Sequence, residues 1–177
     1  MKLFEKVMEK NYIYKGKILN LRKDLVMLPN GNKSVREVIE HRGGVCILAL
    51  DDENNCYFVE QYRYPFEKVI LEAPAGKIDA DEIPLNCAKR ELKEETGLIA
   101  EKFISLGCIY PSTGYTDEII YLYLAKNLTQ EDMSPDEDEF LNVIKIPFTH
   151  VIDMITNNKI CDAKTVAAVL KAKQLLY

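Results

Sequence analysis

The sequence lacks the features that mark a membrane protein, a secreted protein or a protein that binds nucleic acid. No apolar run approaches the ~18 residues that a membrane-spanning helix needs. The start of the chain, MKLFEKVMEK, alternates charged and apolar side chains and has no apolar core of a signal peptide. Basic residues number 23 against 28 acidic ones, so the net charge of −5 lacks the positive excess that nucleic acid or an anionic membrane favours. We therefore expect a cytoplasmic protein with neither nucleic acid nor a membrane as partner.

Paired cysteines and paired histidines are also missing. The five cysteines are scattered, no two form a CxxC motif, and no histidine lies near them at a metal-ligand spacing. They are Cys46, Cys56, Cys87, Cys108 and Cys161. The two histidines, His41 and His150, have no partner at such a spacing either, and we assign them no role. The pattern favours reduced, mostly buried thiols, as in a cytosolic protein.

The first 42 residues have the pattern of a small β structure. Two extended, apolar-rich stretches occupy residues 17–28 and 33–41. Between them lies Asn30-Gly31, and Asn-Gly is a strong hairpin signal because both residues tolerate a positive φ. We predict an N-terminal β subdomain over residues 1–42, which contains an antiparallel hairpin, followed by a main domain over residues 43–177.

The main domain alternates short apolar strands with few helices. Predicted strands are residues 45–50, 56–61, 69–72, 103–110, 118–125 and 141–146. Predicted helices are residues 84–96, 147–156 and 162–176. The first helix is the best defined, since Pro84 suits its first position and Gly97 its C-terminal cap. Strands that precede and follow one helix, with two helices at the end, predict an α+β domain with a mixed sheet packed between helices.

That first helix carries a cluster of acidic residues on one flank. Glu91 and Glu95 are one turn apart, and Glu94 is a neighbour of Glu91 by three residues. Such clustered carboxylates suit a hard cation such as Mg²⁺ or Mn²⁺, which takes oxygen ligands. The alternative is a solvated acidic face, although negative charge near a helix C-terminus opposes the helix dipole. The spacing alone leaves both interpretations open.

The segment around this helix resembles the Nudix box, whose pattern is G-x5-E-x7-R-E-U-x-E-E-x-G-U with U an aliphatic residue. Every fixed position is filled, by Gly76, Glu82, Arg90, Glu91, Leu92, Glu94, Glu95, Gly97 and Leu98. Matches at fixed spacing over the whole pattern make this a specific signal. One local departure is Ile83, which stands where a polar N-cap residue is common, and we expect it to lower helix stability and leave the chemistry intact.

The resemblance implies a role for each residue of the cluster. Glu91 and Glu95 would be the main metal ligands, Glu94 a supporting one, and the backbone carbonyl of Ala75 a further one. Arg90 would orient a carboxylate through a charge-assisted hydrogen bond. The implied cofactor is Mg²⁺ or Mn²⁺, as two or three ions. The implied fold is the Nudix fold, with the N-terminal hairpin as an extension.

Three further stretches resemble the ADP-ribose pyrophosphatase branch of this family. They are EQYRYP at residues 60–65, LEAPAGK at residues 71–77 and YPSTGY at residues 110–115. In the last of these, Thr113 replaces a proline that is often a marker of ADP-ribose specificity. The departure concerns the substrate and not the class of reaction.

This branch implies further site residues. Glu139, at the end of an acidic run, would deprotonate the attacking water or bind an additional metal, with Glu137 as the alternative. Arg63 and Arg36 would contact phosphate and adenine, and Glu37 lies beside Arg36 on the N-terminal hairpin. The alternatives are a solvated acidic loop for the two glutamates and surface ion pairs for the two arginines.

The implied activity is metal-dependent hydrolysis of ADP-ribose to AMP and ribose 5-phosphate. Other nucleoside diphosphate sugars, a dinucleotide, or a non-catalytic role as an ADP-ribose sensor are the alternatives. We also expect a homodimer, because a lone hairpin is marginal in water and related enzymes exchange this hairpin between two subunits. Gly43-Gly44 would be the hinge of that exchange.

Overall fold

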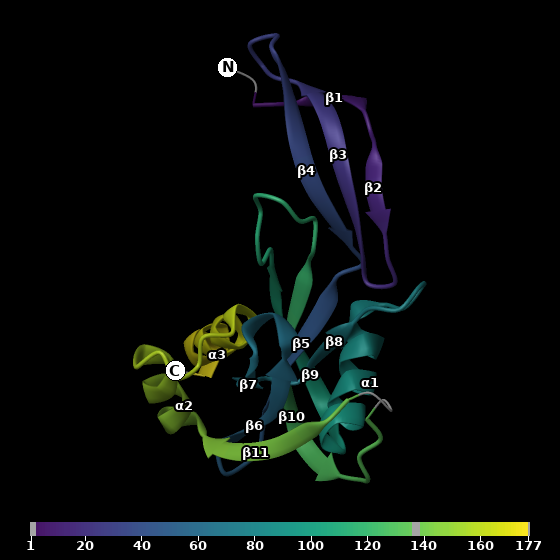
Figure 1. Cartoon of the computed structure of the whole chain (residues 1–177). Coiled ribbons are helices and arrows are strands. Elements are labelled where there is room, and N and C mark those ends of the chain that lie inside the picture. Colours follow the sequence, from purple (N-terminus) through teal and green to yellow (C-terminus); the bar gives the residue numbers. More distant parts are fainter. Residues whose placement is uncertain (1–2, 136–138, 177) are drawn as a thin grey trace. The chain divides into compact units, whose positions relative to one another are not determined.

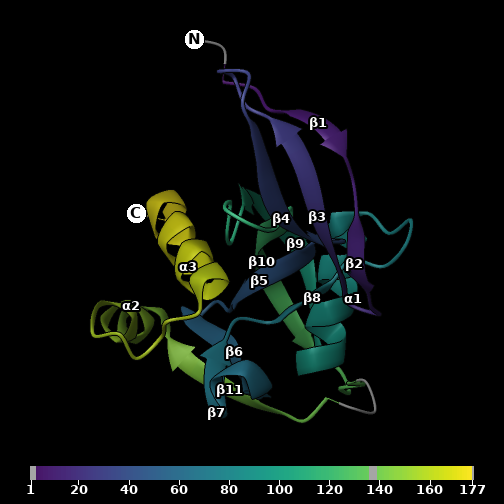
Figure 2. The same cartoon turned by 45° about the horizontal axis from the view of Figure 1, so that its top comes forward.

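The computed structural model describes residues 3–135 and 139–176 of the chain. It divides into two compact units. The N-terminal unit comprises Met1–Gly43 and Tyr110–Ile119, and the larger unit comprises Gly44–Ile109 and Ile120–Tyr177 (Figures 1 and 2). Among the described residues, no helix is long and apolar enough to cross a membrane.

The N-terminal unit is built on a four-stranded antiparallel sheet. Its strands are β1 (Lys6–Glu9), β2 (Tyr12–Lys15), β3 (Leu19–Met27) and β4 (Lys33–His41). β3 pairs with all three others: β4 follows its whole length, while β1 and β2 pair with its two ends. The β3–β4 hairpin agrees with the prediction, and Gly31 takes a φ of +86° in its turn. Besides the predicted hairpin, the unit contains β1 and β2, whose individual bounds the sequence does not show because they are short and exposed.

A second segment of the chain completes this unit. The backbone N–H of Ile39 in β4 donates to the carbonyl of Tyr115 at 2.7 Å, and the N–H of Asp117 donates to the carbonyl of Ile39 at 3.2 Å. Residues 110–119 therefore lie along β4. Gly43 has a φ of +89°, and a Cβ there would lie 2.7 Å from the carbonyl oxygen of Ile119, so a glycine is needed at this position.

The larger unit contains a seven-stranded mixed sheet. Its central strand β5 (Gly44–Leu50) is buried along its whole length and runs parallel to β10 (Ile120–Gln130). The other pairings are antiparallel, and the main order is β11-β6-β5-β10-β9. The remaining strands are β6 (Asn55–Arg63), β7 (Lys68–Glu72), β8 (Ala75–Lys77), β9 (Leu98–Ile109) and β11 (Leu141–Pro147). β7 pairs with β6, and β8 pairs with β5. The short connection between β7 and β8 therefore joins a strand beside β6 to a strand beside β5.

Helices cover both faces of this sheet (Figure 1). On one face, Val45, Ile47 and Ala49 of β5 pack with residues of α1 (Pro84–Thr96). On the other, Cys46, Leu48 and Leu50 of β5 pack with residues of α2 (Phe148–Thr156) and α3 (Ala163–Leu176). Successive side chains of a strand point to opposite faces, so β5 contributes to both cores. The predicted α+β architecture, a mixed sheet between helices, is confirmed.

Candidate functional site

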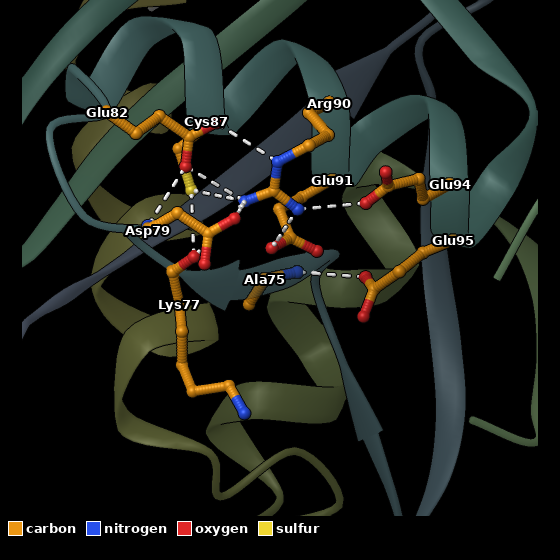
Figure 3. Close-up of polar contacts among 9 residues, drawn as sticks. All are labelled: Ala75, Lys77, Asp79, Glu82, Cys87, Arg90, Glu91, Glu94 and Glu95. Carbon is orange, nitrogen blue, oxygen red and sulfur yellow. Dashed lines mark hydrogen bonds and ion pairs between the residues drawn. The ribbon is translucent and has the colours of Figure 1, made fainter. Parts of the chain in front are cut away.

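The predicted acidic residues lie where α1 faces β8 (Figure 3). The carboxylates of Glu91, Glu94 and Glu95 lie on one flank of the helix; those of Glu91 and Glu95 reach the strand, and that of Glu94 turns toward Arg90. Glu91 is 8% exposed and Glu95 is 2% exposed, while Glu94 is half-buried. A solvated acidic face does not describe this flank, because two of its three carboxylates are buried.

Gly76 makes room for the first of these carboxylates. A Cβ atom at Gly76 would lie 1.9 Å from the carboxylate carbon of Glu91, which is far inside the contact distance. Gly76 pairs with Val45 at the centre of the sheet, so the strand cannot move aside easily. The first glycine of the box is therefore required by the packing of α1 on β8.

The backbone of Ala75 is directed toward the same flank. The N–H of Ile47 donates to the carbonyl of Pro74 at 2.8 Å, and the next residue, Ala75, lies opposite Cys46. Residues of an antiparallel ladder alternate between bonding to the partner strand and pointing away from it. The N–H and the carbonyl of Ala75 thus both point away from β5. The N–H donates to Oε2 of Glu95 at 2.9 Å, so the carbonyl lies on the side of β8 that faces Glu95.

Arg90 joins the loop before α1 to the acidic flank. Its Nη1 donates to Glu91 at 2.8 Å and to Glu94 at 2.9 Å. Its Nε and Nη2 donate to the two oxygens of Glu82 at 3.0 and 2.9 Å, and Nη2 also donates to the carbonyl of Lys77 at 3.2 Å. Arg90 lowers the pKa of Glu82 to about 2. One guanidinium thus fixes the direction of two carboxylates of the flank and holds the loop that precedes them.

A single arginine does not balance the negative charge of the flank. Burial raises the pKa of Glu91 to about 7, although Arg90 acts against it, and the charges of Glu94 and Glu139 raise it further. Burial also raises the pKa of Glu95 to about 8, against the hydrogen bond from Ala75. Additional positive charge would keep both groups ionised near neutral pH.

The donor set fits a hard divalent cation. All candidate ligands are oxygens: the carboxylates of Glu91, Glu94 and Glu95 and the carbonyl of Ala75. Among the described residues, no group of three or more acidic, histidine or cysteine side chains is placed to hold a metal ion. Mg²⁺ does not need one, because it usually keeps several waters and uses one or two carboxylates together with substrate phosphates.

Glu139 lies near this cluster of carboxylates. It is half-buried, two residues before β11, and its charge contributes to the raised pKa of both Glu91 and Glu95. The alternative base, Glu137, falls outside the described residues.

Arg63 lies at the end of β6 and is held by a buried carboxylate. Its Nε and Nη2 donate to the two oxygens of Glu72 at 2.6 and 2.8 Å, and Glu72 is 2% exposed. Its charge lowers the pKa of Glu95, so Arg63 is also near the acidic flank. The pairing is a bidentate, part-buried ion pair and not a loose surface contact.

Arg36 and Glu37 belong to the N-terminal unit. Arg36 donates to both carboxylate oxygens of Glu5, at 2.9 and 2.5 Å, and to the hydroxyl of Ser34 at 3.1 Å. Glu37, the next residue of β4, is exposed and points to the opposite face of the sheet. The two neighbouring side chains therefore lie on different faces of β4, and Arg36 forms an ion pair with Glu5 of the same unit.

The sequence did not indicate the groups behind this site. Glu72 also accepts a hydrogen bond from Lys164, and Thr165 accepts one from the backbone of Ala73. The carboxylate of Asp162, the residue before α3, accepts the N–H of Thr165 at 3.0 Å. Residues paired across 92 positions leave no local pattern in a single sequence.

Comparison with known proteins shows which families and relatives this chain is similar to. A model described as NUDIX domain matches residues 40–169, and one described as nucleoside diphosphate sugar hydrolase N-terminal domain matches residues 5–39. The chain is 39% identical over 178 residues to an ADP-ribose pyrophosphatase of Bacillus subtilis (strain 168), an alignment that covers 98% of this chain and 96% of that protein. It is 43% identical over 171 residues to a methanol dehydrogenase activator of Bacillus methanolicus, covering 95% and 92%. A solved structure titled as an ADP compounds hydrolase shares the fold, with a TM-score of 0.88 at 22% identity, covering 99% of this chain and 96% of that one.

Proposed function

We propose, since the chain belongs to the Nudix hydrolase family, that this pyrophosphohydrolase cleaves the pyrophosphate bond of ADP-ribose to give AMP and ribose 5-phosphate. The observation that carries the proposal is the buried carboxylate pair of Glu91 and Glu95, which lies against Gly76 and the backbone N–H of Ala75 in β8. A relative named as an ADP-ribose pyrophosphatase, aligned over almost the whole chain, supports the choice of substrate.

Nudix enzymes generally use divalent metal ions, and the donor set fits them. Glu91, Glu95 and the carbonyl of Ala75 would hold two or three Mg²⁺ or Mn²⁺ ions, with Glu94 in support. Such ions, when bound, neutralise the charge of the pyrophosphate and make an attacking water more acidic. Arg90 keeps Glu91 and Glu94 in position through the hydrogen bonds described above.

The proton of the attacking water would pass to the carboxylate of Glu139. This role is supported by its closeness to Glu91 and Glu95, whose pKa values its charge raises. Arg63 would contact a phosphate through Nη1, because Nε and Nη2 are bound to Glu72. A planar donor fixed in this way loses little side-chain freedom when it binds an anion.

We propose further that the protein acts as a homodimer in which Arg36 and Glu37 of one subunit contact the adenine held by the other. The N-terminal unit supports a dimer because several of its apolar side chains remain exposed in the single chain. They include Leu3, Phe4, Val7, Met8, Ile13, Tyr14 and Ile18. A second copy is the partner that closes such a face with two-fold symmetry.

A panel of nucleotides tests the substrate. Thr113, in place of the usual proline, favours a second candidate, another nucleoside diphosphate sugar or a dinucleotide. Purified protein with Mg²⁺ should release AMP and ribose 5-phosphate from ADP-ribose with the highest kcat/KM of the panel. If another compound has a higher kcat/KM, that compound and not ADP-ribose is the preferred substrate. If no compound of the panel is hydrolysed, the result favours a non-catalytic sensor of ADP-ribose.

A further inference from the structure

The connection between β7 and β8 is bound by the N-terminus of α3. The N–H of Ala73, the first residue of this connection, donates to Oγ1 of Thr165 at 2.8 Å. Ala73 and Thr165 are both fully buried. Since Ala73 is two residues before Ala75, this hydrogen bond acts on the backbone that carries the proposed metal-binding carbonyl.

The hydroxyl of Thr165 is itself held in place. It donates to Oδ2 of Asp162 at 2.6 Å, and the same oxygen accepts the backbone N–H of Thr165 at 3.0 Å. Asp162 is thus the cap of α3, and its negative charge lies at the favourable end of the helix dipole. Because the hydroxyl group donates its hydrogen bond to Asp162, its oxygen accepts the hydrogen bond from the N–H of Ala73.

Glu72, the residue before Ala73, is held by ion pairs. Glu72 binds the fork of Arg63 on one side and the ammonium group of Lys164 on the other. Nζ of Lys164 also donates to Oδ1 of Asp162 at 2.9 Å. The four side chains carry two positive and two negative charges, so the network is neutral, as a part-buried set of ions requires.

The connection has little freedom left between these points. Ala73 is bound to Thr165, the carbonyl of Pro74 to the N–H of Ile47, and the N–H of Ala75 to Glu95. Only the first of these three bonds depends on α3, so it is the one that can be removed without changing β5 or the acidic flank.

We propose that Thr165, held by Asp162 and aided by Lys164, is a positioning residue that sets the direction of the Ala75 carbonyl and so raises the affinity for the divalent ion. The inference rests on the proposed function, in which that carbonyl is a metal ligand. The outer partners of metal ligands typically contribute about 10- to 100-fold in metal affinity, and Thr165 acts through two residues of backbone. We therefore expect an effect near the lower end of that range.

The test is Mn²⁺ binding by the purified protein, measured from the electron paramagnetic resonance signal of the free ion. Thr165→Val removes the acceptor and keeps the shape of the side chain, and it should raise the Kd for Mn²⁺ about tenfold. Thr165→Ser keeps the hydroxyl and should restore the affinity. With saturating Mg²⁺, kcat of Thr165→Val should stay near wild type, while the metal concentration that gives half the maximal rate rises.

Two controls separate the possible failures. Circular dichroism and thermal unfolding without metal report the fold, because a merely structural role would lower the melting temperature and leave the Kd of the folded protein unchanged. Unchanged Mn²⁺ affinity in folded Thr165→Val would overturn the positioning role. If that variant does not fold, Lys164→Met must show the same weaker binding, and wild-type binding there overturns the role equally. Wild-type binding by Glu95→Gln would instead overturn the metal site, and with it the proposed function.

Discussion

Glu91 and Glu95 dominate the site at the scale of single residues because both are buried with a raised pKa. At pH values between about 5 and 8 the folded, metal-free protein holds protons that the unfolded chain, with a glutamate pKa of 4.5, has already lost. Protons bound more tightly by the folded state mean that the free energy of unfolding falls as pH rises through this window. This is the opposite of an ordinary carboxylate ion pair such as Glu82, whose pKa of about 2 matters only in more acidic solution.

We predict that the chelator-treated protein becomes less stable between pH 5 and pH 8, and that Mg²⁺ opposes the loss. Urea unfolding at several pH values, with and without metal, measures it. Glu95→Gln cannot ionise and should flatten the dependence, whereas Glu101→Gln, in an exposed part of β9, should leave it unchanged. Stability that rises with pH across this window would show that the two carboxylates are already compensated without metal.

A second prediction at this scale concerns the proposed base. Glu139→Gln keeps the size of the side chain and removes its ability to accept a proton. General base catalysis typically contributes about 10²–10⁴-fold, so kcat should fall by that order while KM changes little. Steady-state kinetics with ADP-ribose and saturating Mg²⁺ measure both constants. An unchanged kcat would move the role to another group, with Glu137 the next to be tested.

At the scale of elements, the N-terminal cap of α1 lacks a side chain that can accept a hydrogen bond. Ile83 is the cap residue, makes no side-chain hydrogen bond to the helix and is 55% exposed, so little packing depends on it. Ile83→Ser would supply an acceptor for the N–H groups of the first turn, and such caps contribute about 1 kcal/mol. We predict a higher free energy of unfolding by that order, with kcat unchanged. A stability no greater than wild type would mean that the loop before α1 does not admit cap geometry.

Local signals account for the elements that the sequence predicted correctly. α1 has the predicted bounds because Pro84 starts it and Gly97, with a φ of 70°, ends it. β8 was not predicted, since Ala75-Gly76-Lys77 shows no alternation and is a strand only through its pairing with β5. β9 begins at Leu98 and not at residue 103, because pairing with β10 extends it.

The same distinction applies to the site. Spacing along one helix is enough to place Glu91, Glu94 and Glu95 together, because residues three and four apart lie on one flank. The groups that fix Arg63 and Ala73 include residues of α3 and its cap, which are far away in the sequence. Short-range periodicity carries no information about such contacts, so they become visible only once the chain is folded.

At the scale of the whole molecule, the proposed dimer predicts complementation between two inactive chains. If Arg36 of one subunit serves the site of the other, mixing Arg36→Ala with Glu95→Gln places both lesions in one site of the heterodimer and leaves the other intact. Activity should then partly recover after subunits are mixed and allowed to exchange. Without such sharing, every site carries one lesion and no recovery appears. Sedimentation equilibrium at micromolar concentration is the first step, and a fully active 20.3 kDa species would rule out the dimer.

The N-terminal unit is discontinuous in the chain, which has a consequence for the order in which the protein is made. β4 leaves the ribosome long before residues 110–119, the segment that bonds to it. An unpaired strand edge is a site for unwanted association, so the nascent chain is exposed to that hazard until residues 110–119 have also left the ribosome. For the same reason a truncation that starts at Gly44 would leave residues 110–119 without their strand, and the two units cannot be separated by a single cut.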